Sequence, residues 1–380
     1  ATVVATTSVS ILMFCMISPL IFSVLMGFVL IIYPIPNFGL GNKRVHVVES
    51  GGVYSNPRDL SKGDMTTFIV RRFLWLPVLL VIVSFVTFVL GLYGPGDPAE
   101  VRLGARATPE AVERMRDQLG LDRNLFVQYG SYVWNFVRGD LGDSYIFQGR
   151  TVRELVIPKV WISAQLGLAA MLISVGLGIP LGLFTAYKQG TWWDTALVSV
   201  SLVFVATPVF ISAPFLILFF AVKLGVFPVS GWDGFFSTSL VMPALVMGTP
   251  GIAGMTRLTR ASAMDVLSQE YIRTARAKGL SEITVQTRHV LKNALMPVVT
   301  ILGLSLAGLV EGAFITETIF GIPGIGRLAV DSIFNRDYPV IMALVIIVAT
   351  VFVLANLLVD LLYGFLDPRT RQSLDNYGTR

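Results

Sequence analysis

Residues 162–184 read ISAQLGLAAMLISVGLGIPLGLF and contain no charged side chain. A helix needs about 20 predominantly apolar residues to cross the hydrocarbon core of a bilayer, and this stretch is long enough. Apolar runs of this length also exceed what a buried strand of a soluble domain requires. The stretch therefore predicts a membrane-spanning helix.

The same pattern recurs along the chain and predicts seven spanning helices. They are Ile11–Ile32, Leu74–Leu92, Ile162–Phe184, Ala196–Val222, Leu240–Met255, Met296–Ile315 and Val340–Leu362. The fifth is short and contains Pro243, Gly248 and Pro250. Such helix breakers survive in a membrane where neighbouring helices or a water-filled cavity satisfy the backbone. We expect this span to face the protein interior, with these three residues as candidates for lining a pathway.

The composition supports an all-α polytopic membrane protein. Hydrophobic residues make up 54% of the chain, charged residues make up 14%, and the mean hydropathy is +0.72. These values exclude intrinsic disorder, and the single cysteine, Cys15, excludes a disulfide scaffold and a cysteine-based metal site. The net charge of +5 indicates cytoplasmic loops and not nucleic-acid binding.

The positions of Lys and Arg predict the orientation, because short basic loops resist translocation. Arg71 and Arg72 precede the second span, and residues 256–295 carry seven basic against three acidic side chains. The loops between the fourth and fifth spans and between the last two spans are nearly neutral. Residues 256–295 and the polar tail 367–380 are therefore expected in the cytoplasm.

This arrangement divides the chain into four regions, which are residues 1–64, 65–159, 160–366 and 367–380. Residues 65–159 hold the first core helix and an extracytoplasmic segment, and residues 160–366 hold the remaining core helices with the loop 256–295. Residues 93–159 balance their charges and indicate a small folded extracytoplasmic domain. Within it, the start at Thr108-Pro109-Glu110 and the pattern through Leu119 predict a capped helix.

Residues 1–64 form a separate N-terminal extension in which no basic residue precedes Lys43. A secretory signal peptide needs a positive region ahead of its apolar stretch, so that alternative fits poorly. We expect a retained extra transmembrane helix, with Ala1 outside and Lys43 inside. A fusion or an upstream start is the remaining alternative, because Met65-Thr66-Thr67-Phe68 resembles an independent beginning.

The chain lacks the residues that several kinds of catalysis and binding require. No phosphate-binding loop of the Gly-x-x-x-x-Gly-Lys-Ser/Thr type occurs, so any ATP dependence has to come from a partner. The two histidines, His46 and His289, lie in separate loops and form no metal-binding cluster. No serine sits in a Gly-x-Ser-x-Gly turn with a histidine to serve as base. We expect no catalytic residue, no metal site and no cofactor bound by this chain.

The loop 256–295 contains the most informative motif, because residues 270–281 read EYIRTARAKGLS. Met264, Leu267, Tyr271 and Ala275 recur at helical spacing and predict one apolar face on a basic helix. Gly279 is suited to end that helix, and Ser281 to cap a second short one. Two short helices joined by a glycine turn would form a rigid hook that docks in a partner's groove; a solvated or lipid-bound loop is the alternative. The residues of the hook are Tyr271, Ile272, Arg273, Thr274, Ala275, Arg276, Ala277, Lys278, Gly279, Leu280 and Ser281.

From Met65 to about Arg371 the chain resembles the permeases of binding-protein-dependent ABC importers, in the dipeptide, oligopeptide and nickel branch. The hook is similar to the so-called EAA loop, with Arg273-Thr274-Ala275 where the wider superfamily has Glu-Ala-Ala. The other matching motifs are Gly96-Asp97-Pro98, Leu119-Gly120-Leu121-Asp122, Gln128-Tyr129, residues 139–144 (GDLGDS), residues 293–297 (NALMP), residues 317–320 (ETIF) with Pro323-Gly324, residues 336–339 (RDYP) and residues 366–369 (LDPR).

The resemblance implies a six-helix permease core in the bacterial inner membrane. It also implies a second permease subunit, two cytoplasmic ATPase subunits that use ATP and Mg, and an external solute-binding protein. On this basis Tyr271 to Ser281 would seat in the ATPase groove, with Arg273, Arg276 and Lys278 on its rim and the apolar face supplying affinity. The implied substrate is a di- or oligopeptide, and a nickel chelate or another small solute is the alternative.

Two carboxylates near the sixth span require separate interpretations, because a charge there needs water or a partner. Glu311 lies well inside the apolar segment and is a candidate for the pathway or for a structural hydrogen bond. Glu317, near the outer end, favours a structural role. An ion-coupled secondary transporter is the alternative from another class; it needs an intramembrane relay and usually an inverted repeat, and neither is clear here.

Overall fold

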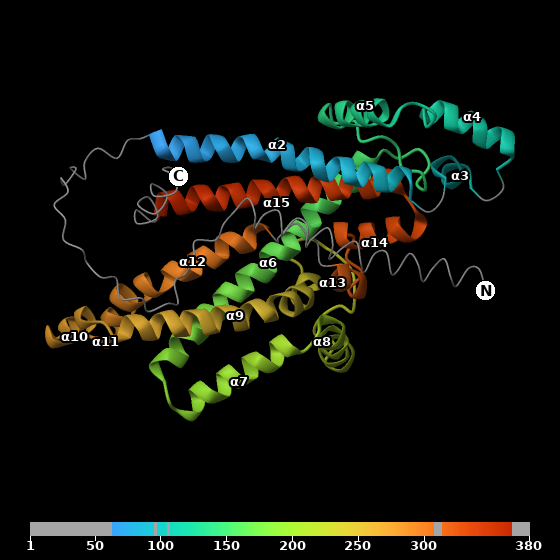
Figure 1. Ribbon diagram of the computed structural model, residues 1–380. Coiled ribbons are helices and arrows are strands. Elements are labelled where there is room, and N and C mark those ends of the chain that lie inside the picture. The colour runs from blue at the N-terminus through green and yellow to red at the C-terminus, as the bar shows by residue number, and fades with distance from the viewer. Residues whose placement is uncertain (1–62, 95–96, 105–106, 308–313, 367–380) are drawn as a thin grey trace. The chain divides into compact units, whose positions relative to one another are not determined.

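The computed structural model describes residues 63–94, 97–104, 107–307 and 314–366, and these residues form helices joined by loops (Figure 1). Among them, extended pairing is limited to one isolated bridge between Asp143 and Thr151. The all-α class predicted from the sequence is confirmed. The expected span Ile11–Ile32 lies outside the described residues, as do Glu311 and the tail 367–380.

The helices follow one another in the order of the expected spans and loops. They are α2 (Gly63–Leu92), α3 (Pro98–Leu103), α4 (Pro109–Leu119), α5 (Leu125–Val137), α6 (Val152–Tyr187), α7 (Trp192–Ala206), α8 (Val209–Leu216), η1 (Ile217–Lys223), η2 (Thr238–Leu240), α9 (Val241–Leu267), α10 (Glu270–Ala277), α11 (Glu282–Thr284), η3 (Val285–Leu291), α12 (Lys292–Ala307), α13 (Phe314–Ile319), α14 (Ile325–Asn335) and α15 (Tyr338–Leu366).

Three stretches of the described chain are long and apolar enough to cross a membrane as single helices, namely Val152–Tyr187, Thr238–Leu267 and Tyr338–Ala355. A shorter apolar helical stretch, Leu76–Leu92, belongs to α2. These agree with four of the expected spans. Of the expected span Met296–Ile315, the structure shows α12 to Ala307 and the start of α13 at Phe314.

The expected span Ala196–Val222 is wrong as a single helix. It is divided into α7 and a second helical stretch, Val209–Lys223, with a bend of 105° between them. Pro208 is the cause, because the residue before a proline is driven out of the helical region, and Thr207 has φ −86° and ψ 114°. Pro208 then starts α8 as its N-cap. The bent pair is one broken span or a re-entrant segment.

Helix α9 stays continuous through Pro243 and Pro250 and is the most enclosed of the candidate spans. It packs along α6 at glycine positions on both helices. A Cβ on Gly248 would lie 2.9 Å from the carbonyl oxygen of Ala170, and one on Gly182 would lie 2.6 Å from that of Thr256. Small residues allow two membrane helices to approach this closely. The prediction that this span faces the protein interior is confirmed.

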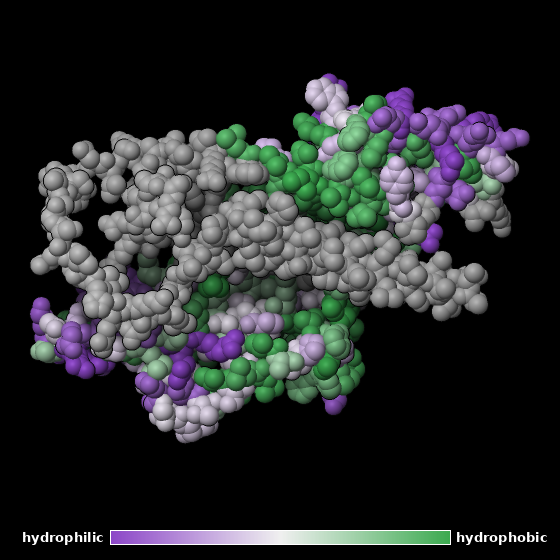
Figure 2. Space-filling view, in the orientation of Figure 1, coloured by the Kyte–Doolittle hydropathy of each residue, from purple (hydrophilic) through white to green (hydrophobic). Residues whose placement is uncertain are grey.

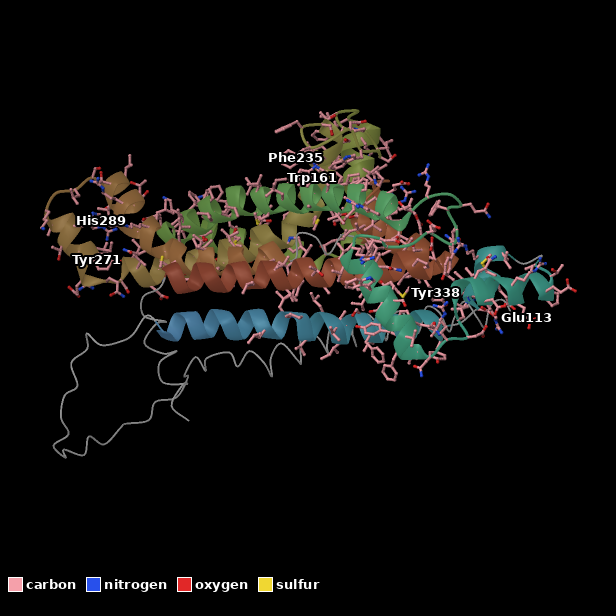
Figure 3. All side chains as sticks on the ribbon, turned by 90° about the horizontal axis from the view of Figure 1, so that it is seen from above. Glu113, Trp161, Phe235, Tyr271, His289 and Tyr338 are labelled. Carbon is pink, nitrogen blue, oxygen red and sulfur yellow. The ribbon has the colours of Figure 1, made fainter. Side chains whose placement is uncertain are left out.

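The two ends of the helical bundle carry different elements (Figures 1 and 3). Helices α10 and α11, with Tyr271 and His289 nearby, lie at the same end as the start of α2 and the end of α15. Helices α3, α4 and α14, with Glu113 and Tyr338, lie at the opposite end. The separation of the loop 256–295 from the segment 93–159 agrees with the opposite membrane sides that the basic residues predicted for them. We call the first the hook end and the second the α3–α4 end.

The described residues of the segment 93–159 include the helices α3, α4 and α5. Helix α4 begins at the N-cap Thr108, whose hydroxyl accepts from the backbone N–H of Ala111, and ends at Gly120 with φ 65°. The predicted capped helix is therefore confirmed. Neither α4 nor α5 has a buried residue, however, and α5 rests on α2 through aromatic side chains.

Candidate functional site

The inner face of the hook is made by Ile272 and Ala275 of α10, which are 0% and 6% exposed. They pack in a cluster with residues from α6, α9, η3 and α12, including Ala186, Ala263 and Val290. The expectation that Ala275 belongs to an outward apolar face is wrong, because this cluster turns it inward. Tyr271, expected on the same outward face, is 43% exposed and does face outward.

Helix α10 ends in a glycine turn. Gly279 has φ 77°, and its N–H donates to the carbonyl of Arg276 at 2.9 Å, while the N–H of Leu280 donates to that of Ala275 at 3.4 Å. This pair of bonds is the Schellman pattern, in which the left-handed residue is most often glycine because it has no Cβ. The prediction that Gly279 ends the helix is confirmed.

Two side-chain interactions hold the next segment against α10. The hydroxyl of Ser281 accepts from the N–H of Thr284 at 3.4 Å, which confirms the predicted cap. The guanidinium of Arg276 donates to both carboxylate oxygens of Glu282, at 2.9 and 3.3 Å. These bonds cross the turn from α10 to α11 and bridge the two arms of the hook at its surface.

The second arm is not an isolated short helix. Helix α11 continues through η3, a π-helical stretch, directly into α12. Asn293, in the first turn of α12, donates to the hydroxyl of Tyr271 at 3.0 Å and to the carbonyl of His289 at 2.9 Å. Both arms are therefore joined to the spanning helices, one through α9 and the other through α12.

The outer face of the hook is a mixed polar and apolar surface. Leu280 and Ile283 are 39% and 74% exposed at the turn, and the same segment carries Arg273, Arg276 and Lys278, of which the first two are paired with Glu270 and Glu282. The exposed residues of this face are Glu270, Tyr271, Arg273, Thr274, Arg276, Ala277, Lys278, Gly279, Leu280, Ser281, Glu282 and Ile283. An exposed apolar pair within a rim of charged side chains is suited to a protein groove.

At the α3–α4 end, Glu317 is fully buried and caps a helix. One carboxylate oxygen accepts from the hydroxyl of Ser163 at 2.6 Å, and the other accepts from the N–H of Arg327, in the first turn of α14, at 2.9 Å. A Cβ on Gly324 would lie 2.4 Å from this carboxyl group, so the glycine makes room for it. The positive end of a helix dipole stabilises a carboxylate in this place. The structural interpretation of Glu317 is confirmed.

A second buried carboxylate joins two of the sequence motifs. Asp337, which precedes α15, accepts from the hydroxyl of Ser144 and from the N–H of Tyr145, the latter at 3.1 Å. The Ser144 hydroxyl in turn accepts from the N–H of Phe147 at 2.8 Å. The motif at 139–144 and the motif at 336–339 are thus halves of one contact, which anchors the loop before α6 to the start of α15.

Two family models match most of the described chain. The model described as "Binding-protein-dependent transport system inner membrane component" matches residues 178–372, and its N-terminal counterpart matches residues 65–148. The chain belongs to this family of inner-membrane permeases. The family, the inner-membrane location and the permease class expected from the sequence are confirmed.

Relatives of the permease agree with this assignment. A "Probable peptide ABC transporter permease protein" of Sinorhizobium fredii is 38% identical over 313 residues, which cover 81% of this chain and 100% of the relative. A "Dipeptide transport system permease protein" of Escherichia coli strain K12 is 38% identical over 338 residues, 81% of this chain and 99% of the relative. A solved methionine ABC transporter structure matches 55% of this chain and 95% of its own at 17% identity and a TM-score of 0.43.

An ion pair near the hook end of the permease was missed in the sequence. Asp194, in the first turn of α7, is 5% exposed and accepts from Nε and Nη2 of Arg260 on α9 at 2.7 and 2.8 Å. It also accepts from the N–H of Gly190 at 3.2 Å. The sequence signal was weak, because Asp194 follows two tryptophans that suggest only a membrane interface. The pair ties the broken span to the helix that leads into the hook.

The candidates for the pathway are spread over α9. Pro243 and Gly248 are buried inside the subunit, and Pro250 is exposed. Gly248 is packed against α6 as described above, whereas Pro250 has an open surface. The pathway role suggested for these residues stays a prediction. Among the described residues, no group of acidic, histidine or cysteine side chains has the arrangement of a metal site.

Proposed function

We propose that this ABC permease imports di- or oligopeptides that an external solute-binding protein delivers, and that it forms half of the pathway with a second permease. The peptide class is supported by the names of both relatives, each of which is a peptide or dipeptide permease. The coverage of nearly their full length supports a shared transport role. Nickel chelates or other small solutes remain the alternative substrates for the same machinery.

The coupling of ATP hydrolysis to transport is proposed to pass through the hook. The observation that carries this proposal is the glycine turn closed by the N–H groups of Gly279 and Leu280, with α9 and α12 leading from its two arms. A rigid protrusion attached to two spanning helices transmits a displacement of its tip to both of them. A solvated loop without fixed geometry has no such property.

The contact with an ATPase subunit is proposed to use the exposed tip and not the buried side of α10. Leu280 and Ile283 supply the apolar centre, and Arg273, Arg276 and Lys278 form the rim. Apolar centres carry most of the affinity of such contacts, while rim charges tune association and salt dependence. The face that docks is thus made by different residues from those favoured by the helical periodicity.

The test is co-purification of the ATPase subunits with tip variants of the full chain. Leu280→Asp and Ile283→Asp should each lower ATPase recovery, because a carboxylate would be buried at the centre of the contact. Phe236→Asp is the matched control, since Phe236 is 98% exposed in the turn between η1 and η2, outside the hook. Undiminished recovery with both tip variants would reject the proposed contact.

The substrate class is tested separately in vesicles that contain the complete transporter. Uptake of a labelled dipeptide and of a nickel chelate is compared in the presence of ATP and the solute-binding protein. Peptide uptake without nickel uptake supports the proposal, and the reverse selects the alternative. An effect of Glu311→Gln on cationic peptides larger than on neutral ones would further assign Glu311 to the pathway.

A further inference from the structure

Helix α5 has three distinct faces although none of its residues, Leu125 to Val137, is charged. Successive residues of a helix are rotated by about 100°, which assigns each side chain to a face. The first face is Leu125, Tyr129, Tyr132 and Phe136, the second is Gln128, Ser131 and Asn135, and the third is Phe126, Val127, Gly130, Trp134 and Val137, with Val133 at the boundary between the first and third faces.

The first face fixes the rotation of α5 against α2. The rings of Phe85 and Tyr129 meet edge to face with centroids 5.1 Å apart, and those of Phe88 and Tyr132 are 5.4 Å apart. The hydroxyl of Tyr129 lies 2.7 Å from the Ser84 hydroxyl and 3.0 Å from the carbonyl oxygen of Val81. With this face held on α2, the directions of the other two are determined.

The second face is polar and lines a cavity of about 380 Å³ beneath α5. Gln128, Ser131 and Asn135 border it together with Leu92 of α2 and Leu141. The polar side chains of α5 are therefore gathered on the side that water or loops of the same chain can reach.

The third face is apolar throughout and largely exposed, and at its edge the Phe126 ring stacks on Phe85 of α2 with centroids 6.2 Å apart. Phe126 and Val137 are 71% and 74% exposed, and Val127 and Trp134 are also exposed. At its end, the guanidinium carbon of Arg138 lies 4.4 Å from the centroid of the Trp134 ring. An aromatic ring beside an arginine at the end of an apolar helix is typical of the boundary between a bilayer and water.

This third face is continuous with the apolar surface of a spanning helix. The contacts of Tyr129 reach Val81, which lies 11 residues and roughly 16 Å before the outer end of α2 at Leu92. Beside them, α2 exposes Val78, Ile82 and Val86. In Figure 2 the surface of α4 is hydrophilic, and a hydrophobic area lies next to it over α2 and α5.

We propose that α5 lies in the bilayer, with Phe126, Val127, Trp134 and Val137 against the acyl chains of the leaflet at the α3–α4 end. Its occupant is lipid, because the face is free of charge, joins the exposed apolar surface of a span in an inner-membrane protein and ends at an arginine–tryptophan pair. The helix then covers the outer half of α2 within the membrane, and only α3, α4 and the loops extend into water.

The test uses single cysteines in the full chain with Cys15 replaced by serine. Phe126→Cys and Val137→Cys report on the third face, and Ser131→Cys on the polar face. Val78→Cys on α2 is the lipid reference, and Gln148→Cys in an exposed turn is the water reference. Each is labelled with an environment-sensitive fluorophore, reconstituted in phosphatidylcholine vesicles and exposed to nitroxide-labelled lipid or to aqueous iodide.

Quenching by lipid at positions 126 and 137 equal to that at position 78, with protection from iodide, is the expected result. Positions 131 and 148 should show the opposite preference. Quenching of both third-face positions by iodide would place α5 in water and overturn the proposal. Protection from both quenchers would also overturn it, because the face would then be covered by protein, either a partner subunit or residues 1–62 of the same chain.

Discussion

Arg260 of α9 holds Asp194 of α7 by two parallel hydrogen bonds of 2.7 and 2.8 Å at a point where both side chains are largely withdrawn from solvent. Paired donors of a guanidinium match the two oxygens of a carboxylate, which makes this geometry strong and specific. The contact joins two residues on different helices that are 66 positions apart in the chain.

The first prediction is that Asp194→Asn and Arg260→Gln each lower the stability of the purified permease by about 1–3 kcal/mol. The double variant should lose less than the sum, because the second substitution removes a partner that is already lost. Thermal unfolding in detergent measures the three values. Strict additivity would show that the two side chains do not stabilise one another.

The second prediction concerns Glu317, which accepts from Ser163 and from the first turn of α14. Glu317→Ala leaves these buried donors without a partner and should cost roughly 3 kcal/mol. Glu282→Ala is the control, because that carboxylate is more than half exposed and its ion pair should contribute little to stability. Equal losses in melting temperature for the two variants would contradict the capping role.

The third prediction compares two glycines of α9. Gly248→Ala should destabilise the permease by about 1–3 kcal/mol, because the new Cβ would lie 2.9 Å from the Ala170 carbonyl oxygen on α6. Nothing lies within 4 Å of a Cβ on Gly254, so Gly254→Ala should be neutral or stabilising by up to about 1 kcal/mol. If Gly254→Ala lowered the stability as much as Gly248→Ala, close packing against α6 would not be the reason for a glycine at position 248.

The fourth prediction concerns the turn of the hook. Gly279 has φ 77°, and a Cβ there would meet no atom within 4 Å, so strain and not crowding decides the outcome. Coupled ATP hydrolysis should fall in the order Gly279→Asn, Gly279→Ala, Gly279→Pro. Asparagine tolerates the left-handed region, alanine pays about 1–2 kcal/mol, and proline cannot adopt that φ at all. Normal coupling in the proline variant would contradict the account of the turn.

Local rules predicted the features that depend on short stretches of sequence. Long apolar runs located α6, α9 and α15, the Thr108 cap located α4, and Gly279 and Ser281 marked the turn of the hook. Each of these depends on residues that lie within a few positions of one another, so the sequence alone was sufficient.

Features that depend on distant residues were missed or misassigned. The inward rotation of Ala275 is set by Ala186 and Val290, which belong to other helices. The contacts between Asp194 and Arg260 and between Ser144 and Asp337 join residues 66 and 193 positions apart, and no periodicity predicts them. The bend at Pro208 was missed for a different reason. The span was predicted from its hydropathy, which is uniform across the bend, whereas the bend follows from the backbone restriction that a proline places on the residue before it.

In the proposed mechanism, the hook couples this permease to ATPase subunits. The most direct measurement is ATP hydrolysis in liposomes that contain the permease co-purified with the products of its neighbouring genes, with and without a peptide-loaded solute-binding protein. We predict recovery of ATPase subunits and hydrolysis that the loaded binding protein stimulates, with both lost in Leu280→Asp. Purification of the permease alone, together with solute movement down an ion gradient without ATP, would contradict the account.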